Sequence, residues 1–430
     1  MNTIRFKFIK FVIVLAAIVS PPSAVRADGL SSLLGGSHVQ PGWNNAAPPY
    51  PSAGMFPDYG PPCSSSTSYG PGGGGPYGGG GFADYGGVEC GPSWYDFSVE
   101  GMYLDRRISG KSNIDLISDN PGNTAVVVLS ASDADFEFEA GIRATLRYQL
   151  NATDSIEGVY VDGLDWESTV TVNDSDIGGD MNDLFSVFSQ FGQVPIGGFE
   201  ETDAAETASL TYRSNLESVE FNFRRGWISR NARIHGSWIG GLRYLRLNEQ
   251  FSHAIHWVDV QTMGTTTTTS TNLFNYDINT RNDLLGFQGG AKVGWCLMPG
   301  LIAHSQIKAG VYGNRASQNS RLVNTVTTLV STSSSVATTL DVPESAKDDV
   351  ISFATDASAW MTWQLHPLVK IRCGYEVWFM QGLALGPDNF NTSPPAEFTP
   401  TPTTPARQVF LDDQGEVLYH GARLGLEVGW

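Results

Sequence analysis

The chain has 430 residues, and charged residues make up 16% of them, below the roughly 25% of ordinary soluble domains. Acids outnumber Lys and Arg by 44 to 26, so the net charge is −18, which argues against a nucleic-acid partner because neutralising phosphates requires clustered bases. No segment after residue 27 has the ~18 consecutive apolar residues of a membrane-spanning helix, yet there are 11 Trp, 15 Tyr and 22 Phe. A fold that alternates polar and apolar residues would reconcile these properties.

Residues 1–27 have the layout of an export signal peptide. Arg5, Lys7 and Lys10 precede an apolar run, and Ala27 ends a stretch of small residues suited to cleavage. The sequence therefore predicts an exported protein.

Residues 28–92 are rich in Gly and Pro. Such a stretch cannot bury enough apolar area to offset its backbone entropy, so we expect a flexible periplasmic linker. Cys63 and Cys90 flank its glycine-rich part. In an exported protein they could form a disulfide that closes this stretch, or remain as free thiols.

From residue 93 to residue 430 the apolar residues recur with period two. In 136–150, for example, Phe136 and Phe138 share a face while Glu137 and Glu139 share the other, a pattern typical of strands. These strands are long enough to cross a membrane when tilted. We predict an all-β fold, a transmembrane antiparallel β-barrel of about ten strands, with twelve as the alternative count. The expected strands lie near 94–105, 135–150, 154–166, 210–224, 232–248, 276–295, 301–314, 349–365, 369–381 and 417–430.

The connections alternate in length, as they do in outer-membrane barrels. Short turns follow the even-numbered strands, and the odd-numbered strands are followed by long polar loops at 106–134, 167–209, 249–275, 315–348 and 382–416. The Thr-rich parts of the third and fourth loops suit strand-like extensions above the membrane. A shift of apolar parity between Leu216 and Val219 predicts a β-bulge.

One face of the strands carries charges, which we expect to line the lumen and either to pair or to border a narrow path. The lumen-lining residues are predicted to be Glu137, Glu139, Arg143, Arg147, Arg243, Lys292, Lys308, Lys370, Arg372, Glu376, Arg423 and Glu427. Trp at strand ends predicts a periplasmic aromatic girdle, made of Trp94, Trp227, Trp295, Trp363 and Trp430. The opposite girdle is predicted to contain Tyr103, Trp166, Trp378, Phe379 and Tyr419.

The end of the chain and two inner segments carry a family resemblance. Leu424, Leu426, Val428 and Trp430 alternate up to a terminal aromatic residue, which is similar to the signal that outer-membrane proteins present to the barrel-assembly machinery. Residues 241–249, 282–290 and the tail from Leu418 resemble the large β-barrel outer-membrane family of planctomycete bacteria. The resemblance covers roughly residues 94–430 and implies a porin-like barrel in the bacterial outer membrane, with no assigned binding residue.

The motifs of common enzymes are missing, including the Gly-x-Ser-x-Gly elbow and His-Glu-x-x-His. His253, His256, Asp162 and Asp165 lie near the expected external rim, which makes a rim enzyme or a metal pair a weak third hypothesis. We expect no enzyme activity, no metal centre and no cofactor.

The expected partners are outer-membrane lipid, the barrel-assembly machinery and cell-wall or surface components, with no nucleic acid. The leading interpretation is a barrel with a structural or cell-surface interaction role. The alternative is a narrow porin-like channel for small ions or solutes.

Overall fold

A computed structural model describes residues 94–109, 113–119, 126–177, 184–193, 202–230, 233–263, 266–330, 334–393 and 407–430. The predicted signal peptide, the linker, Cys63 and Cys90 lie outside these residues. Cys296 is disulfide-bonded, and Cys373 is a free cysteine on the exposed face of its strand. No helix in the described part of the chain is long and apolar enough to span a membrane.

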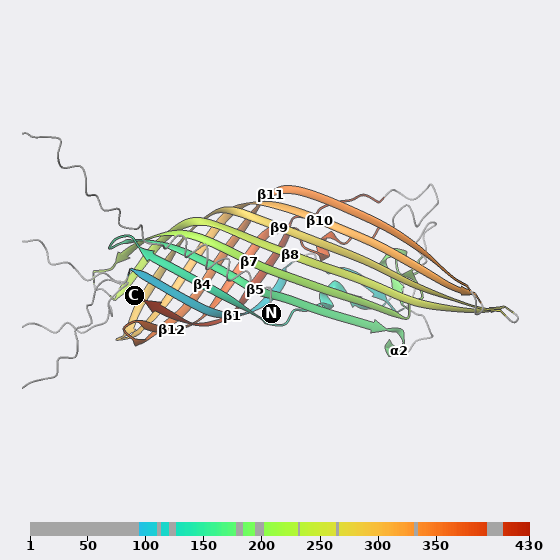
Figure 1. Cartoon of the computed structure of the whole chain (residues 1–430), viewed down its shortest axis with the longest axis horizontal. Coiled ribbons are helices and arrows are strands. Elements are labelled where there is room, and N and C mark those ends of the chain that lie inside the picture. The colour runs from blue at the N-terminus through green and yellow to red at the C-terminus, as the bar shows by residue number, and fades with distance from the viewer. Residues whose placement is uncertain are drawn as a thin grey trace, which may run out of the picture. The chain divides into compact units, whose positions relative to one another are not determined.

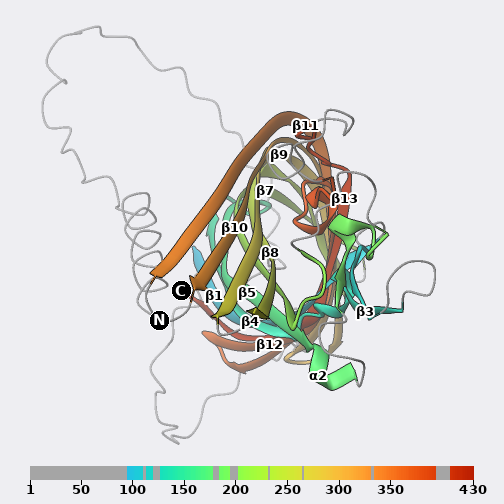
Figure 2. The same ribbon diagram turned by 90° about the vertical axis from the view of Figure 1, so that its right-hand side faces the viewer.

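The described residues form a closed barrel of ten antiparallel strands (Figures 1 and 2). Each strand pairs with its neighbour along the barrel wall, and the first strand closes the ring by pairing with the last over Asp96–Gly429 to Ser109–Glu416. The strands are β1 (Tyr95–Ser109), β4 (Glu139–Gln149), β5 (Asp154–Asn173), β7 (Thr207–Ile228), β8 (Ile234–Met263), β9 (Thr266–Met298), β10 (Leu301–Val330), β11 (Ser334–His366), β12 (Val369–Leu383) and β13 (Gly415–Gly429). The prediction of a ten-stranded all-β barrel is confirmed.

The strands in the middle of the chain are far longer than a membrane requires. β9 and β11 have 33 residues each, whereas about 9–11 tilted residues cross a bilayer. Figure 1 shows β8 to β11 projecting beyond the rest of the barrel. The connections at 249–275 and 315–348 were predicted to be long loops with strand-like Thr-rich parts. In the structure both are β-hairpins, paired up to Met263–Thr266 and Val330–Ser334, so strands occupy nearly the whole of each segment and not only its Thr-rich part.

The predicted bulge in the strand at Leu216 is also wrong in its placement. β7 pairs with β8 in continuous register, and the irregularity lies in β5, where Asp162 and Gly163 are inserted between the pairs Val161–Ser218 and Leu164–Leu216. Gly163 adopts φ +83°, a left-handed conformation that glycine reaches without steric cost.

The parity shift in β7 has a different cause. Along this strand the apolar residues move from the outer face to the inner face, while the same side chains keep pointing inward. In the lower part of the strand, nearer the end of the barrel with the short turns, Phe221 and Phe223 are exposed on the outside while Glu220 is buried inside. Further up the strand, Leu210 and Tyr212 are fully buried inside. The lower barrel therefore faces lipid, and the upper barrel is an extension with an apolar core of its own.

Outward-facing charges mark the level of this exchange. On the outside of β8 and β9, Arg246 and Arg281 pair with Asp283 at 2.9 and 2.6 Å. On β10 and β11, Arg315 and Asp349 have side chains that are 86% and 83% exposed. Charged side chains belong in water, so this ring defines the outer boundary of the lipid-facing band.

The long connections pack into the extension. The first contributes β2 (Asp115–Ser118) and β3 (Val127–Ser130), and the second contributes α2 (Asp174–Ile177) and β6 (Phe185–Ser186). β3, β2 and β6 form a small sheet, whose apolar side chains join the core of the extension together with residues of β7 to β10.

Candidate functional site

The lumen of the lipid-facing band is filled by ion pairs rather than by isolated charges. On the side of β12 and β13, Arg143 Nη1 lies 2.6 Å from Glu376 Oε2, and Arg423 contacts the same carboxylate at 3.5 Å. Arg372 lies 3.3 Å from Glu100 and 3.4 Å from Glu427, which is nearer the end of the barrel with the short turns. Each base thus meets one or two acids, which lie on a neighbouring strand or on a strand farther round the barrel.

A second cluster crosses the middle of the lumen. Lys308 Nζ lies 2.7 Å from Glu220 and 3.0 Å from Asp356, and Arg243 lies 2.8 Å from Asp356 and 3.6 Å from Glu220. These four side chains are at most 7% exposed. An unpaired charge that is buried this deeply would be costly. The two bases and two acids therefore stabilise the barrel only when all four are present.

Two inward-facing tryptophans stack on the bases of these clusters. The Trp360 ring lies 4.6 Å from the Arg423 guanidinium, and the Trp378 ring lies 4.8 Å from that of Arg243. Trp166, Trp378 and Tyr419 are at most 1% exposed. The prediction that they belong to the outer aromatic girdle is wrong, because their strand positions point into the barrel.

The predicted lumen residues on strands β8 to β13 and on β4 lie on inward positions. Lys370 pairs with Glu427 at 2.7 Å, and Arg147 pairs with Glu157 at 3.2 Å. Lys292 lies 5.5 Å from the Trp360 ring. Glu139 is partly buried at the start of β4, whereas Glu137 precedes that strand and is exposed to solvent, so Glu137 does not line the lumen.

Several buried charges were missed by the sequence analysis, among them Asp96, Glu100, Glu220 and Arg224. Their signal was present, because Glu220 and Arg224 alternate with Phe221 and Phe223, which face lipid. The interpretation of the parity shift as a bulge in β7 hid this alternation.

Above the charged lumen lies an apolar layer. It is formed by inward side chains of most strands and includes Leu216, Leu245, Leu284 and Trp378, all buried. Leu383 and Leu385 complete the layer from the end of β12 and the segment that follows it, so part of the last long connection lies inside the barrel.

Residues 383–391 of this connection are buried almost throughout and form a plug segment. A buried loop must have its backbone polar groups paired, and inward amide side chains of β9 and β10 provide the partners. Asn282 Nδ2 donates to the carbonyl of Ala384 at 2.8 Å, and the Ala384 amide donates to Asn282 Oδ1 at 2.8 Å. Gln318 donates to the carbonyl of Asn389 at 3.3 Å.

A buried ion pair fixes the plug segment to the opposite wall. Arg106 of β1 pairs with Glu249 of β8, and both side chains have no exposed surface. Glu249 also accepts hydrogen bonds from the Tyr212 hydroxyl and from the Gly386 amide, each at 2.8 Å. One carboxylate of β8 therefore connects β1, β7 and the plug segment.

The predicted periplasmic girdle residues all lie at the end of the barrel with the short turns. Trp94, Trp295, Trp363 and Trp430 are 50–60% exposed. Trp227 lies against Gly236, where a Cβ atom would come within 2.5 Å of the indole ring. Trp238, 64% exposed, is a further outward tryptophan near this rim. The residues of the predicted assembly signal, Leu424, Leu426, Val428 and Trp430, face outward on β13 and after it.

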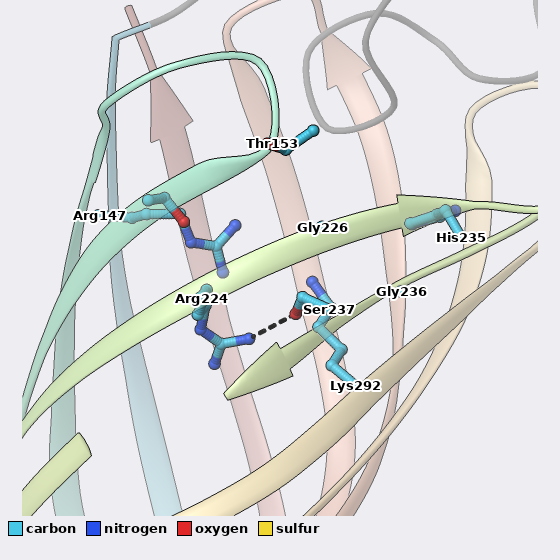
Figure 3. A pocket seen from close by; sticks show the side chains of 9 residues that line it. Arg147, Thr153, Arg224, Gly226, His235, Gly236, Ser237 and Lys292 are labelled. Carbon is cyan, nitrogen blue, oxygen red and sulfur yellow. Dashed lines mark hydrogen bonds between the residues drawn. The ribbon is translucent and has the colours of Figure 1, made fainter. Parts of the chain in front are cut away.

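A small cavity opens among bases near the same end (Figure 3). Arg147, Arg224, His235 and Lys292 line it, and Arg224 Nη1 donates to Ser237 Oγ at 3.4 Å. The cavity has a volume of ≈ 10 Å³, which is room for about one water molecule.

The residues of the rim-enzyme hypothesis do not converge. His253 points into the extension core and is fully buried, which lowers its pKa to about 4. His256 points outward with 40% of its side chain exposed. Asp162 is buried in the bulge of β5, where it accepts a hydrogen bond from Tyr160 at 2.7 Å, while Asp165 is exposed. The two histidines cannot share a metal ion, because they lie on opposite faces of the sheet. Within the described part of the chain, no three His, Cys, Asp or Glu side chains are placed to hold a metal ion.

A closed antiparallel barrel with a lipid-facing band and tryptophans at its rim defines this chain as an outer-membrane β-barrel protein. It belongs to the family described as "Putative beta barrel porin-7 (BBP7)", whose model matches residues 203–430. A comparison with curated protein sequences finds no match.

Solved outer-membrane barrels are distantly similar. The outer membrane protease OmpT from Escherichia coli aligns with 78% of this chain and 96% of its own, at 8% identity and a TM-score of 0.40. The Pseudomonas putida toluene transporter TodX aligns with 79% of this chain and 91% of its own, at 9% identity and a TM-score of 0.22. A Pseudomonas aeruginosa FadL homologue aligns with 78% of this chain and 89% of its own, at 9% identity and a TM-score of 0.21.

Proposed function

We propose that this protein is a closed outer-membrane barrel with a structural or cell-surface interaction role. The observation that carries the proposal is the plug segment, whose Leu383 and Leu385 complete an apolar layer across the lumen. An ion that crossed this layer would lose its hydration shell without gaining a partner, which is expensive.

The lumen below the layer supports the same proposal. A barrel of about eight strands is filled by its side chains, whereas about sixteen strands leave an aqueous channel. In this ten-stranded barrel the Lys308–Glu220 and Arg243–Asp356 pairs occupy the centre. A solute would have to separate buried ion pairs in order to pass.

The extension would then provide the surface role. Its outward face above the charged ring is rich in Ser and Thr, with single exposed apolar residues such as Leu273, and its long hairpins project well beyond the lipid-facing band. We propose cell-wall or surface components as its partners. We also propose that residues 1–27 are an export signal, and that the barrel-assembly machinery of a Gram-negative-type bacterium recognises β13. We propose no enzyme activity and no cofactor.

A narrow channel for small ions or solutes is the second candidate. The observation in its favour is the base-lined cavity at the periplasmic end, where Arg147, Arg224 and Lys292 gather.

Planar-bilayer recording of the refolded full chain separates the two functions. Heat-modifiable gel migration first confirms that the barrel is folded, and a general porin shows that the membranes accept conducting proteins. The closed barrel is expected to give no defined single-channel steps. Defined steps whose size changes in Arg143→Ala or Arg372→Ala would refute the closed barrel and establish the channel.

A further inference from the structure

A second cavity, of ≈ 520 Å³, lies on the outside of the barrel wall. This volume is within the range of small-molecule sites, roughly 300–1,000 Å³. Its lining comes from β11, from the ends of β12 and β13, and from the connection between those two strands. The lining borders the plug segment, because Asp388 belongs to that segment and the backbone of Asp412 is hydrogen-bonded to the Asn389 side chain at 2.8 and 2.9 Å.

The cavity exists because neighbouring strands have different lengths. β12 ends at Leu383 and pairs with β11 only as far as Phe353–Gln381, whereas β11 continues for a further 19 residues, to Ser334. The wall therefore has a seam beside residues 350–353, which is bordered by residues 412–414 and the start of β13 instead of a continuing β12.

The seam lies at the outer boundary of the lipid-facing band. Ile351 and Phe353 are 68% and 50% exposed on the outer face. Asp349, the next outward residue above them, belongs to the ring of charges that marks the boundary. A molecule in the seam would thus touch hydrocarbon on one side and water on the other.

The lining is amphipathic and carries charge of one sign. Asp388, Asp412, Asp413 and Glu416 contribute carboxylates, and none of the described residues that line the cavity is basic. The nearby base Arg315 faces Asp349 at 3.8 Å, outside the lining. Such a lining is complementary to a cation that carries an apolar chain.

We propose that this seam binds an amine-bearing amphiphile, with its ammonium head among the carboxylates and its hydrocarbon chain along Ile351 and Phe353. An ammonium donates hydrogen bonds to several carboxylates at once, and these acids come from two stretches of the chain, residue 388 and residues 412–416. The exposed apolar pair continues onto the lipid-facing surface, which accommodates a chain of membrane length.

The test uses the full chain in phosphatidylcholine liposomes with spin-labelled stearylamine as the probe. Electron paramagnetic resonance measures the fraction of the probe that is immobilised by protein, and stearic acid with the same label provides the comparison. The test variant combines Asp412→Asn, Asp413→Asn and Glu416→Gln. The control variant makes the same change in charge at exposed positions far along the wall, with Asp165→Asn, Glu167→Gln and Glu137→Gln.

We expect the wild-type chain and the control variant to bind stearylamine about tenfold more tightly than stearic acid, and the test variant to lose this preference. In Ile351→Ser the selectivity for the amine is retained while both long-chain probes bind more weakly. Equal immobilisation in the wild type and the test variant would overturn the proposal, as would an equal loss in the control variant. Displacement of the amine by millimolar Ca²⁺ would also overturn it, since the seam would then be a divalent-cation site. Heat-modifiable migration confirms that every variant is folded.

Discussion

Replacement of Asn282 by Ala tests whether the plug segment is held by the hydrogen bonds described above. The substitution removes both 2.8 Å hydrogen bonds to Ala384, a residue with no exposed surface, and takes away the acceptor of a 3.0 Å bond from Asn314. Each of the two lost bonds leaves a buried backbone group of Ala384 unpaired, which costs about 1–2 kcal/mol. Opening of the plug segment should therefore become easier by about 2–4 kcal/mol.

Hydrogen exchange with mass spectrometry measures this opening directly. Amides in peptides that cover residues 380–391 should exchange about 30- to 900-fold faster in Asn282→Ala, because local exchange follows the free energy of local opening. Asn279→Ala is the matched control, since Asn279 lies on the same strand but is exposed. Unchanged exchange in the first variant, or an equal acceleration in the control, would refute the assignment of Asn282 as the residue that holds the plug segment.

Two further predictions concern the lumen and the extension. Lys308→Met should lower the free energy of unfolding in detergent by about 3–5 kcal/mol, because Glu220 and Asp356 are left buried without the ammonium; the exposed Lys347→Met should change it by less than about 0.5 kcal/mol. Burial lowers the pKa of His253 from 6.5 to about 4, so the unfolded chain takes up the proton first. Stability should fall by up to about 3 kcal/mol as the pH drops from 7 to 4. Denaturation curves of His253→Phe should lack this component, and an identical pH dependence in both proteins would contradict the assignment.

The membrane part of this fold was predictable because its pattern is local. The strand at 369–381 shows Lys370, Arg372 and Glu376 on one face and apolar residues on the other, and the structure places it as β12 with the charged face inward. The strand count and the positions of the rim tryptophans follow from the same alternation.

The extension was only partly predictable, because its two faces reverse their meaning along an unbroken strand. In β9, Leu285 is exposed to lipid, whereas Tyr276, on the opposite face, is buried in the extension core. The alternation continues through this change, so nothing in the local sequence shows where the lipid ends. The plug segment was not predicted either, since its partners Asn282 and Gln318 are ordinary polar residues in sequence and become specific only when distant strands bring them together.

The length of the β9–β10–β11 ladders has a mechanical consequence. The register of β10 with β11 runs without interruption from Leu301–Trp363 to Val330–Ser334. A pull on the hairpin tip, directed along the strands, would therefore load some thirty cross-strand pairs in shear at the same time instead of opening them one after another. Force applied at the tips of the hairpins would be transmitted to the opposite rim of the barrel by a single stiff sheet with no hinge between the two ends.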